Sequence, residues 1–120
     1  MQEVVDKINL IVRNYSYLEL SMLSFERSRL IIAGSEDIMY FHNFEIVFDD
    51  VFTVACNTDW KIDTGKDFIW LVTDIEEIRT ISLAYRVEKG NSIYRLEDED
   101  HCIYYIVAKT ISIKEEVVRY

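Results

Sequence analysis

Alternation of apolar and polar residues is the dominant pattern of the chain, and it is strongest in residues 38–56, IMYFHNFEIVFDDVFTVAC. Five alternate positions are aromatic, aliphatic or histidine: Tyr40, His42, Phe44, Ile46 and Phe48. A period of two over this length is typical of a β-strand with one buried face. A second apolar run, residues 51–56, follows Asp49 and Asp50. We therefore predict a β-hairpin with Asp49-Asp50 as its tight turn and with Phe44, Ile46 and Phe48 in the core.

The first fifteen residues have a different period. Apolar or aromatic residues recur at spacings of three and four: Met1, Val4, Val5, Ile8, Ile11, Val12 and Tyr15. This spacing predicts an amphipathic helix of about fourteen residues. Its polar face lacks the basic cluster of a membrane-surface helix, so we expect it to pack on the protein's own sheet.

Most of the remaining chain is predicted to form short strands. A strand beginning at Leu18 changes parity near Met22, which indicates a β-bulge. Further strands are predicted at residues 29–33, 68–72, 81–87, 92–96, 101–108 and 111–113, with loops at 57–67, 89–91 and 97–100. Asp74, with Glu77 three residues later, has the spacing of a capping box and indicates one short helical turn.

These elements predict the fold class. Short strands joined by short loops favour antiparallel pairing between neighbours, and no alternation of strands and helices is present. The 120 residues suit a single domain, 1–120, that is long enough to bury a core. We predict a mainly β protein (α+β by strict counting): an antiparallel meander curled into a barrel or a two-layer sheet, with one N-terminal amphipathic helix.

The charge of the chain is uneven. Twenty-two acidic residues outnumber thirteen basic ones, which gives a net charge of −9, and residues 34–120 carry eighteen of the acids but only nine of the bases. DNA and anionic membranes would be repelled, because binding them requires Lys and Arg. The acidity either serves solubility alone or fits a basic protein partner.

The sequence also favours a cytoplasmic location. The N-terminus, MQEVVDKINL, lacks the basic region of a signal peptide, and no apolar run approaches the ~20 residues needed to span a bilayer. Cys56 and Cys102 are the only cysteines, which suits a reducing compartment but leaves open one bridge between them.

No catalytic or metal-binding motif can be drawn. The glycines are isolated, so no phosphate-binding loop is present, and we expect no cofactor. His42, His101, Cys56 and Cys102 lack the close spacing of zinc ligands, so we expect a hydrogen-bonded histidine at His42, two buried thiols and no metal. The paired carboxylates fall mostly at predicted turns, where solvation makes them poor general acids, so we expect no enzyme activity.

The best candidates for partner contacts are acidic and aromatic residues near one predicted hairpin. They are Glu97, Asp98, Glu99 and Asp100 of the loop, Tyr94 and Tyr104 beside it, and Asp49 and Asp50 at the other predicted turn. Tyrosine beside carboxylates suits recognition of an Arg- or Lys-rich protein surface.

The segment FHNFEIVFDDVF, residues 41–52, the following NTDW and the lack of a catalytic constellation resemble small acidic bacterial β-rich proteins of uncharacterised type. Some of those are immunity proteins that neutralise polymorphic toxins, so the resemblance implies a protein-binding role. The alternative is a small-ligand-binding β-barrel whose pocket would be lined by Phe44, Phe48, Trp70 and Tyr85.

Overall fold

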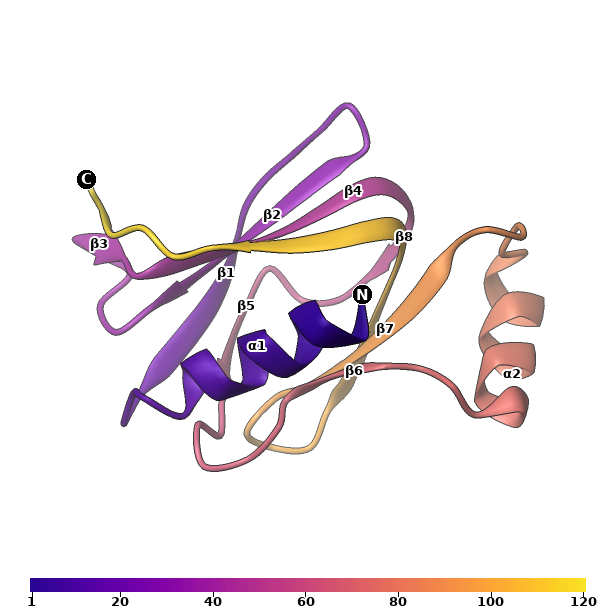
Figure 1. Cartoon of the computed structure of the whole chain (residues 1–120). Helices are drawn as coiled ribbons and strands as arrows, with labels where there is room; N and C mark the ends of the chain where they lie inside the picture. The colour runs from indigo at the N-terminus through magenta and orange to yellow at the C-terminus, as the bar shows by residue number, and fades with distance from the viewer.

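A computed structural model describes all 120 residues, Met1–Tyr120. Seven antiparallel strands form one sheet, in the order β5-β1-β2-β4-β8-β7-β6, that curls into a half-barrel (Figure 1). Its strands are β1 (Leu18–Glu26), β2 (Arg29–Ser35), β4 (Phe44–Ala55), β5 (Asp59–Ile62), β6 (Ile69–Leu71), β7 (Ser92–Glu97) and β8 (Ile103–Lys114). A small second sheet pairs β3 (Phe41–His42) with β9 (Val118–Arg119). The predicted fold class is confirmed.

Helix α1 (Gln2–Val12) lies across the sheet, as predicted from its spacing, and closes the core (Figure 1). Its buried face includes Val5 and Ile8, which belong to the same apolar cluster as Phe44 and Phe48. Buried Asn9 fixes the helix to β6: its side-chain amide donates to the Ile69 carbonyl at 2.9 Å and its oxygen accepts from the Phe68 N–H at 3.0 Å. The helix is therefore held by both apolar burial and satisfied polar contacts.

Strand β4 confirms one prediction and corrects another. Phe44, Ile46 and Phe48 are fully buried, as expected. The chain does not turn at Asp49-Asp50, however, because β4 continues through both residues and pairs with β8 on either side of them. Asp50 has a positive φ of 52°, and the register with β8 shifts between Val51 and Thr53. The Asp49-Asp50 pair predicted to form a turn is therefore part of a β-bulge, which adds a residue to the strand without reversing it.

Helix α2 (Ile75–Tyr85) replaces the strand predicted at 81–87. The Asp74 carboxylate caps the helix by accepting from the Glu77 N–H at 2.9 Å, so the predicted single turn extends to eleven residues. Residues 89–91 consequently connect a helix to β7 and are not a hairpin loop. Neither helix is long and apolar enough to cross a membrane.

Two further boundaries differ from the sequence prediction. The predicted loop at 57–67 contains β5, whose Trp60 and Ile62 are buried and which pairs with β1. The strands predicted at 101–108 and 111–113 belong to the single long strand β8. The β-bulge expected near Met22 is confirmed, because the β1–β2 register shifts between Met22 and Ser24.

Candidate functional site

The acidic segment 97–100 forms the ordered tip of the β7–β8 hairpin, and Asp98 is its structural centre. One carboxylate oxygen accepts from the backbone N–H groups of Asp100 and Cys102, both at 2.9 Å, and the other accepts from the Tyr104 hydroxyl at 2.8 Å. Burial raises the pKa of Asp98, but the hydrogen bonds from Tyr104 and from the two N–H groups outweigh burial, so the pKa lies below its usual value. Burial and the neighbouring carboxylate raise the pKa of Tyr104 to about 12.

Three of the predicted contact residues are largely buried. Tyr94 and Tyr104 are buried, and Asp98 is only 8% exposed. Tyr94 packs edge-on against Phe48, with ring centroids 5.4 Å apart, because its position in β7 faces the core. These three residues stabilise the fold; Tyr94 is enclosed in the core, whereas Asp98 and Tyr104 keep a small exposed fraction, so their role as partner contacts stays a prediction.

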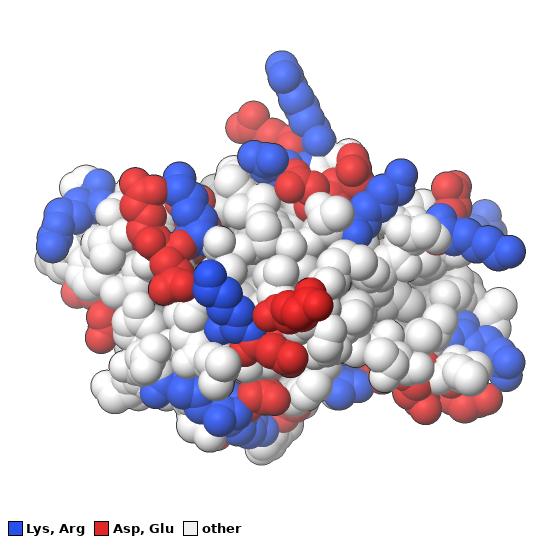
Figure 2. All heavy atoms as spheres, in the orientation of Figure 1, with Lys and Arg blue, Asp and Glu red and all other residues white.

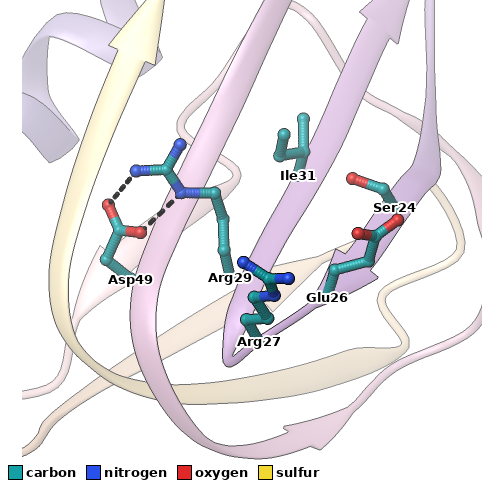
Figure 3. A pocket seen from close by; sticks show the side chains of 6 residues that line it. All are labelled: Ser24, Glu26, Arg27, Arg29, Ile31 and Asp49. Atoms are coloured by element: carbon teal, nitrogen blue, oxygen red, sulfur yellow. Dashed lines mark hydrogen bonds and ion pairs between the residues drawn. The ribbon is translucent and has the colours of Figure 1, made fainter.

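Asp49 and Asp50 are not adjacent to the acidic loop. Asp49 lies opposite Thr110 in β8, whereas segment 97–100 lies beyond the other end of that strand. The Asp49 carboxylate forms an ion pair with Arg29 (Oδ1 to Nε, 2.7 Å). Figure 3 shows this pair in a surface hollow on the β1–β2–β4 part of the sheet, lined by Ser24, Glu26, Arg27, Arg29, Ile31 and Asp49. Two acids and two bases balance there, so the hollow favours no charged partner.

Strand β5 brings additional acids to the loop. The Glu99 N–H donates to the Lys61 carbonyl at 2.9 Å, which joins the hairpin tip to β5. One hollow at this junction is lined by Asn57, Asp59, Trp60, Lys61, Asp98, Glu99, Asp100 and Tyr104, and the next by Ser16, Tyr17, Ile62, Asp63, Thr64 and Glu99. We call the exposed carboxylates Asp59, Asp63, Glu99 and Asp100 the acidic seam.

The acidic seam has an uncompensated charge. None of its four carboxylates forms an ion pair, and Lys61 is the one basic residue that lines either hollow. The Lys61 ammonium lies 5.7 Å from the centre of the Tyr17 ring. Trp60 forms part of the wall, packed against Tyr104, and its indole N–H has no acceptor in the chain. The exposed carboxylates of the seam can therefore accept cationic groups, whereas the unpaired indole N–H of Trp60 is buried behind them.

Sequence reasoning found Glu99 and Asp100 but missed Asp59 and Asp63. Both lie in the stretch predicted to be a loop, and only the pairing of β5 with β1 places them beside the hairpin tip. The available signal was the alternation of polar Asp59 and Lys61 with apolar Trp60 and Ile62, which is the pattern of a short strand.

A second polar cluster flanks the loop. Glu97 accepts from the Lys66 ammonium at 3.1 Å and lies 2.6 Å from Nδ1 of His101. Hydrogen bonds with His101 and Lys66 lower the pKa of Glu97. This carboxylate is compensated, unlike those of the seam.

The two cysteines form no disulfide, and both thiols have a raised pKa. Cys102 is exposed, which corrects the expectation of a buried thiol, whereas Cys56 is half-buried. The Asp98 carboxylate raises the pKa of Cys102, and burial raises that of Cys56. Because the thiolate is the reactive form, neither environment activates a nucleophile.

His42 is hydrogen-bonded, as the sequence predicts, and the structure places it in the interior. It is buried, with Nδ1 2.9 Å from the Tyr120 hydroxyl and Nε2 2.8 Å from the Glu45 carboxylate. No group of three His, Cys, Asp or Glu residues is placed to hold a metal ion.

The residues proposed to line a ligand pocket do not surround a common space. Phe44 and Phe48 are fully buried. The guanidinium carbon of Arg95 lies over the Trp70 ring, 4.8 Å from the ring centre, and Tyr85 lies on α2. None of the five surface hollows is lined by Phe44, Phe48 or Tyr85. Phe44 and Phe48 pack inside the core of the half-barrel.

Comparison of the chain with models of protein families, with curated proteins and with solved structures found no match.

Proposed function

We propose that this protein is a non-enzymatic binding module that holds a basic protein partner at the acidic seam. The observation that carries the proposal is the group of four exposed carboxylates, Asp59, Asp63, Glu99 and Asp100, which have no ion pairs. A partner with clustered Lys or Arg side chains supplies the missing charge. Such complementarity accelerates association and selects against acidic partners.

The geometry of the seam favours protein recognition because its backbone is fixed before binding. The bond between the Glu99 N–H and the Lys61 carbonyl and the network around Asp98 order both sides of the hollow. A preordered surface loses little conformational entropy on association. The partner class that we favour is a basic toxin in the cytoplasm, which would make the chain an immunity or inhibitory protein, in keeping with the resemblance of its sequence.

The test compares two variants that remove the same charge. The seam variant carries Asp59→Asn, Asp63→Asn, Glu99→Gln and Asp100→Asn. The control carries Asp6→Asn, Glu26→Gln, Asp37→Asn and Glu88→Gln, four exposed acids outside the seam that also lack ion pairs. Association with a partner recovered by pull-down from the host is measured between roughly 50 and 500 mM salt.

We expect the seam variant to associate more slowly and with a weaker salt dependence than the control, with a smaller change in dissociation. Equal behaviour of the two variants would mean that only net charge matters, and would exclude the seam as the binding site.

A further inference from the structure

Helix α2 exposes an unusually apolar surface for a peripheral element. Four large side chains are accessible: Ile75 (68%), Ile78 (36%), Leu83 (77%) and Tyr85 (40%). Ile81 is the only buried residue of the eleven. A helix of this length is marginal in water unless packing stabilises it, and here much of its apolar surface remains in solvent.

The inner side of α2 is already occupied. Ile81 contacts the small apolar cluster of Val72, Ile93 and Val107 on the sheet. The Glu77 carboxylate accepts from Arg95 at 2.7 and 2.9 Å and from the Tyr105 hydroxyl at 2.8 Å. These contacts fix the rotation of the helix about its axis, and they leave the exposed side chains directed away from the sheet.

The spacing of the exposed residues suits contact with another helix. Positions 75, 78, 82 and 85, which hold Ile, Ile, Ser and Tyr, follow the alternating three- and four-residue spacing of a helix-pairing seam. Leu83 extends the apolar surface on the outer side. The pattern therefore fits a helical surface better than an irregular loop.

The charge around α2 distinguishes a basic partner from a second copy of the chain as the molecule that covers its apolar surface. Residues 74–95 carry four acids and four bases and are neutral, in a chain whose net charge is −9. Figure 2 shows both signs around uncharged surface at the end of the molecule where α2 lies. A neutral surface provides no electrostatic attraction for a basic partner, and it does not repel a second copy of the same surface.

The two ends of α2 differ in charge. Asp74 and Glu76 lie at its start, with Glu76 in an exposed ion pair with Arg79 (3.2 Å), whereas Arg86 and Lys89 lie at and after its end. When two such helices pair antiparallel, the acidic end of one meets the basic end of the other, and their dipoles oppose. An isologous two-fold arrangement therefore brings opposite charges together.

We propose that α2 is a self-association surface, on which α2 of a second copy packs antiparallel about a two-fold axis. The contact centres on Ile75, Ile78 and Tyr85, with Leu83 at its edge. An eleven-residue helix is about 16 Å long, and it buries less than the roughly 800 Å² per partner of a standard interface. The dimer is accordingly weak and dissociates on dilution.

Sedimentation equilibrium of the whole chain between roughly 10 μM and 1 mM tests the proposal. We expect a reversible monomer–dimer equilibrium that Leu83→Glu and Ile75→Glu each weaken by at least about tenfold. Leu10→Glu is the matched control, because Leu10 is also an exposed leucine (67%) on a helix, but on α1. Its dimerisation should equal that of the wild type, and circular dichroism checks that all variants are folded.

A charge exchange tests the antiparallel geometry. Glu76→Lys and Arg86→Glu should each weaken the dimer, and the double variant should recover affinity because the opposite charges meet again. A chain that stays monomeric up to about 1 mM would overturn the proposal. A dimer that is insensitive to Leu83→Glu and Ile75→Glu would also overturn it, because the contact would then lie elsewhere.

Discussion

The ring of Phe44 lies over the backbone of Gly34, its cross-strand partner in β2. A Cβ atom at Gly34 would overlap three atoms of the ring. The absence of a side chain at Gly34 therefore creates the space in which Phe44 is fully buried, with its ring centre 6.1 Å from that of Tyr15. One glycine and one aromatic residue together fill a single site of the core.

We predict that Gly34→Ala lowers the free energy of unfolding by about 1–3 kcal/mol, because the added methyl group displaces a ring that close neighbours confine. Urea denaturation measures the change. Combining it with Phe44→Leu tests the cause, since removal of the ring should make the two losses less than additive. Strict additivity would show that the ring is not what the methyl group meets.

The buried face of β4 gives a second prediction. Phe44→Ala should cost about 3–5 kcal/mol, because it leaves a cavity in a closed core. Thermal or urea unfolding provides the measurement. A loss below about 1 kcal/mol would contradict the position of Phe44 in the core.

Asp98 and Asp100 should respond differently to the same substitution. Asp98→Asn replaces a buried carboxylate oxygen that accepts hydrogen bonds with an amide, and we expect a loss of about 1–3 kcal/mol. Asp100→Asn changes an exposed side chain and should stay within about 0.5 kcal/mol of the wild type. Equal effects in urea denaturation would show that the network does not depend on the charge of Asp98.

Asp98 also predicts a dependence of stability on pH. Its pKa is lower in the folded state than the roughly 3.9 of an unfolded aspartate. The resulting stabilisation is therefore complete above the unfolded pKa and is lost as the pH falls through the folded pKa. The wild type should lose more stability on acidification from about pH 5 than Asp98→Asn. Parallel curves of unfolding free energy against pH for the two proteins would contradict this assignment.

Metal ions should not affect stability. Both ring nitrogens of His42 are engaged, by Glu45 and Tyr120, and no group of three His, Cys, Asp or Glu side chains is placed to hold a metal ion. The melting temperature should be the same with EDTA and with stoichiometric zinc. A rise of several degrees with zinc would reveal a site that these contacts do not explain.

Hydrophobic periodicity predicted the elements that bury one face. It identified α1, the buried set Phe44, Ile46 and Phe48, and the bulge near Met22. The missed features depend on tertiary pairing. Asp49-Asp50 has a composition that suits a turn, and only the continuous partner strand β8 makes it a bulge. Helix α2 was missed because the alternation of Ile81, Leu83 and Tyr85 also fits a strand, and Ile81 is the one buried residue of the helix.

The candidate site was only partly predictable for the same reason. A run of four acids suggests four solvated charges, but hydrogen bonds from residues further along the chain draw Asp98 into the fold. Conversely, Asp59 and Asp63 become part of the surface because β5 returns to the hairpin tip. Local composition located the loop, and long-range pairing decided which carboxylates remain accessible.

The pairing of β4 with β8 also has a kinetic consequence. The paired residues are roughly fifty to seventy positions apart in the chain, since Ala55 meets Tyr105 and Glu45 meets Lys114. The chain loses conformational entropy when so long a loop closes, before these contacts compensate for the loss. Folding is therefore expected to be slow, in the range of about milliseconds to seconds. Throughout that interval the twelve residues of β4 present an open strand edge that can recruit another chain. Chains of net charge −9 repel one another, and this repulsion opposes such encounters.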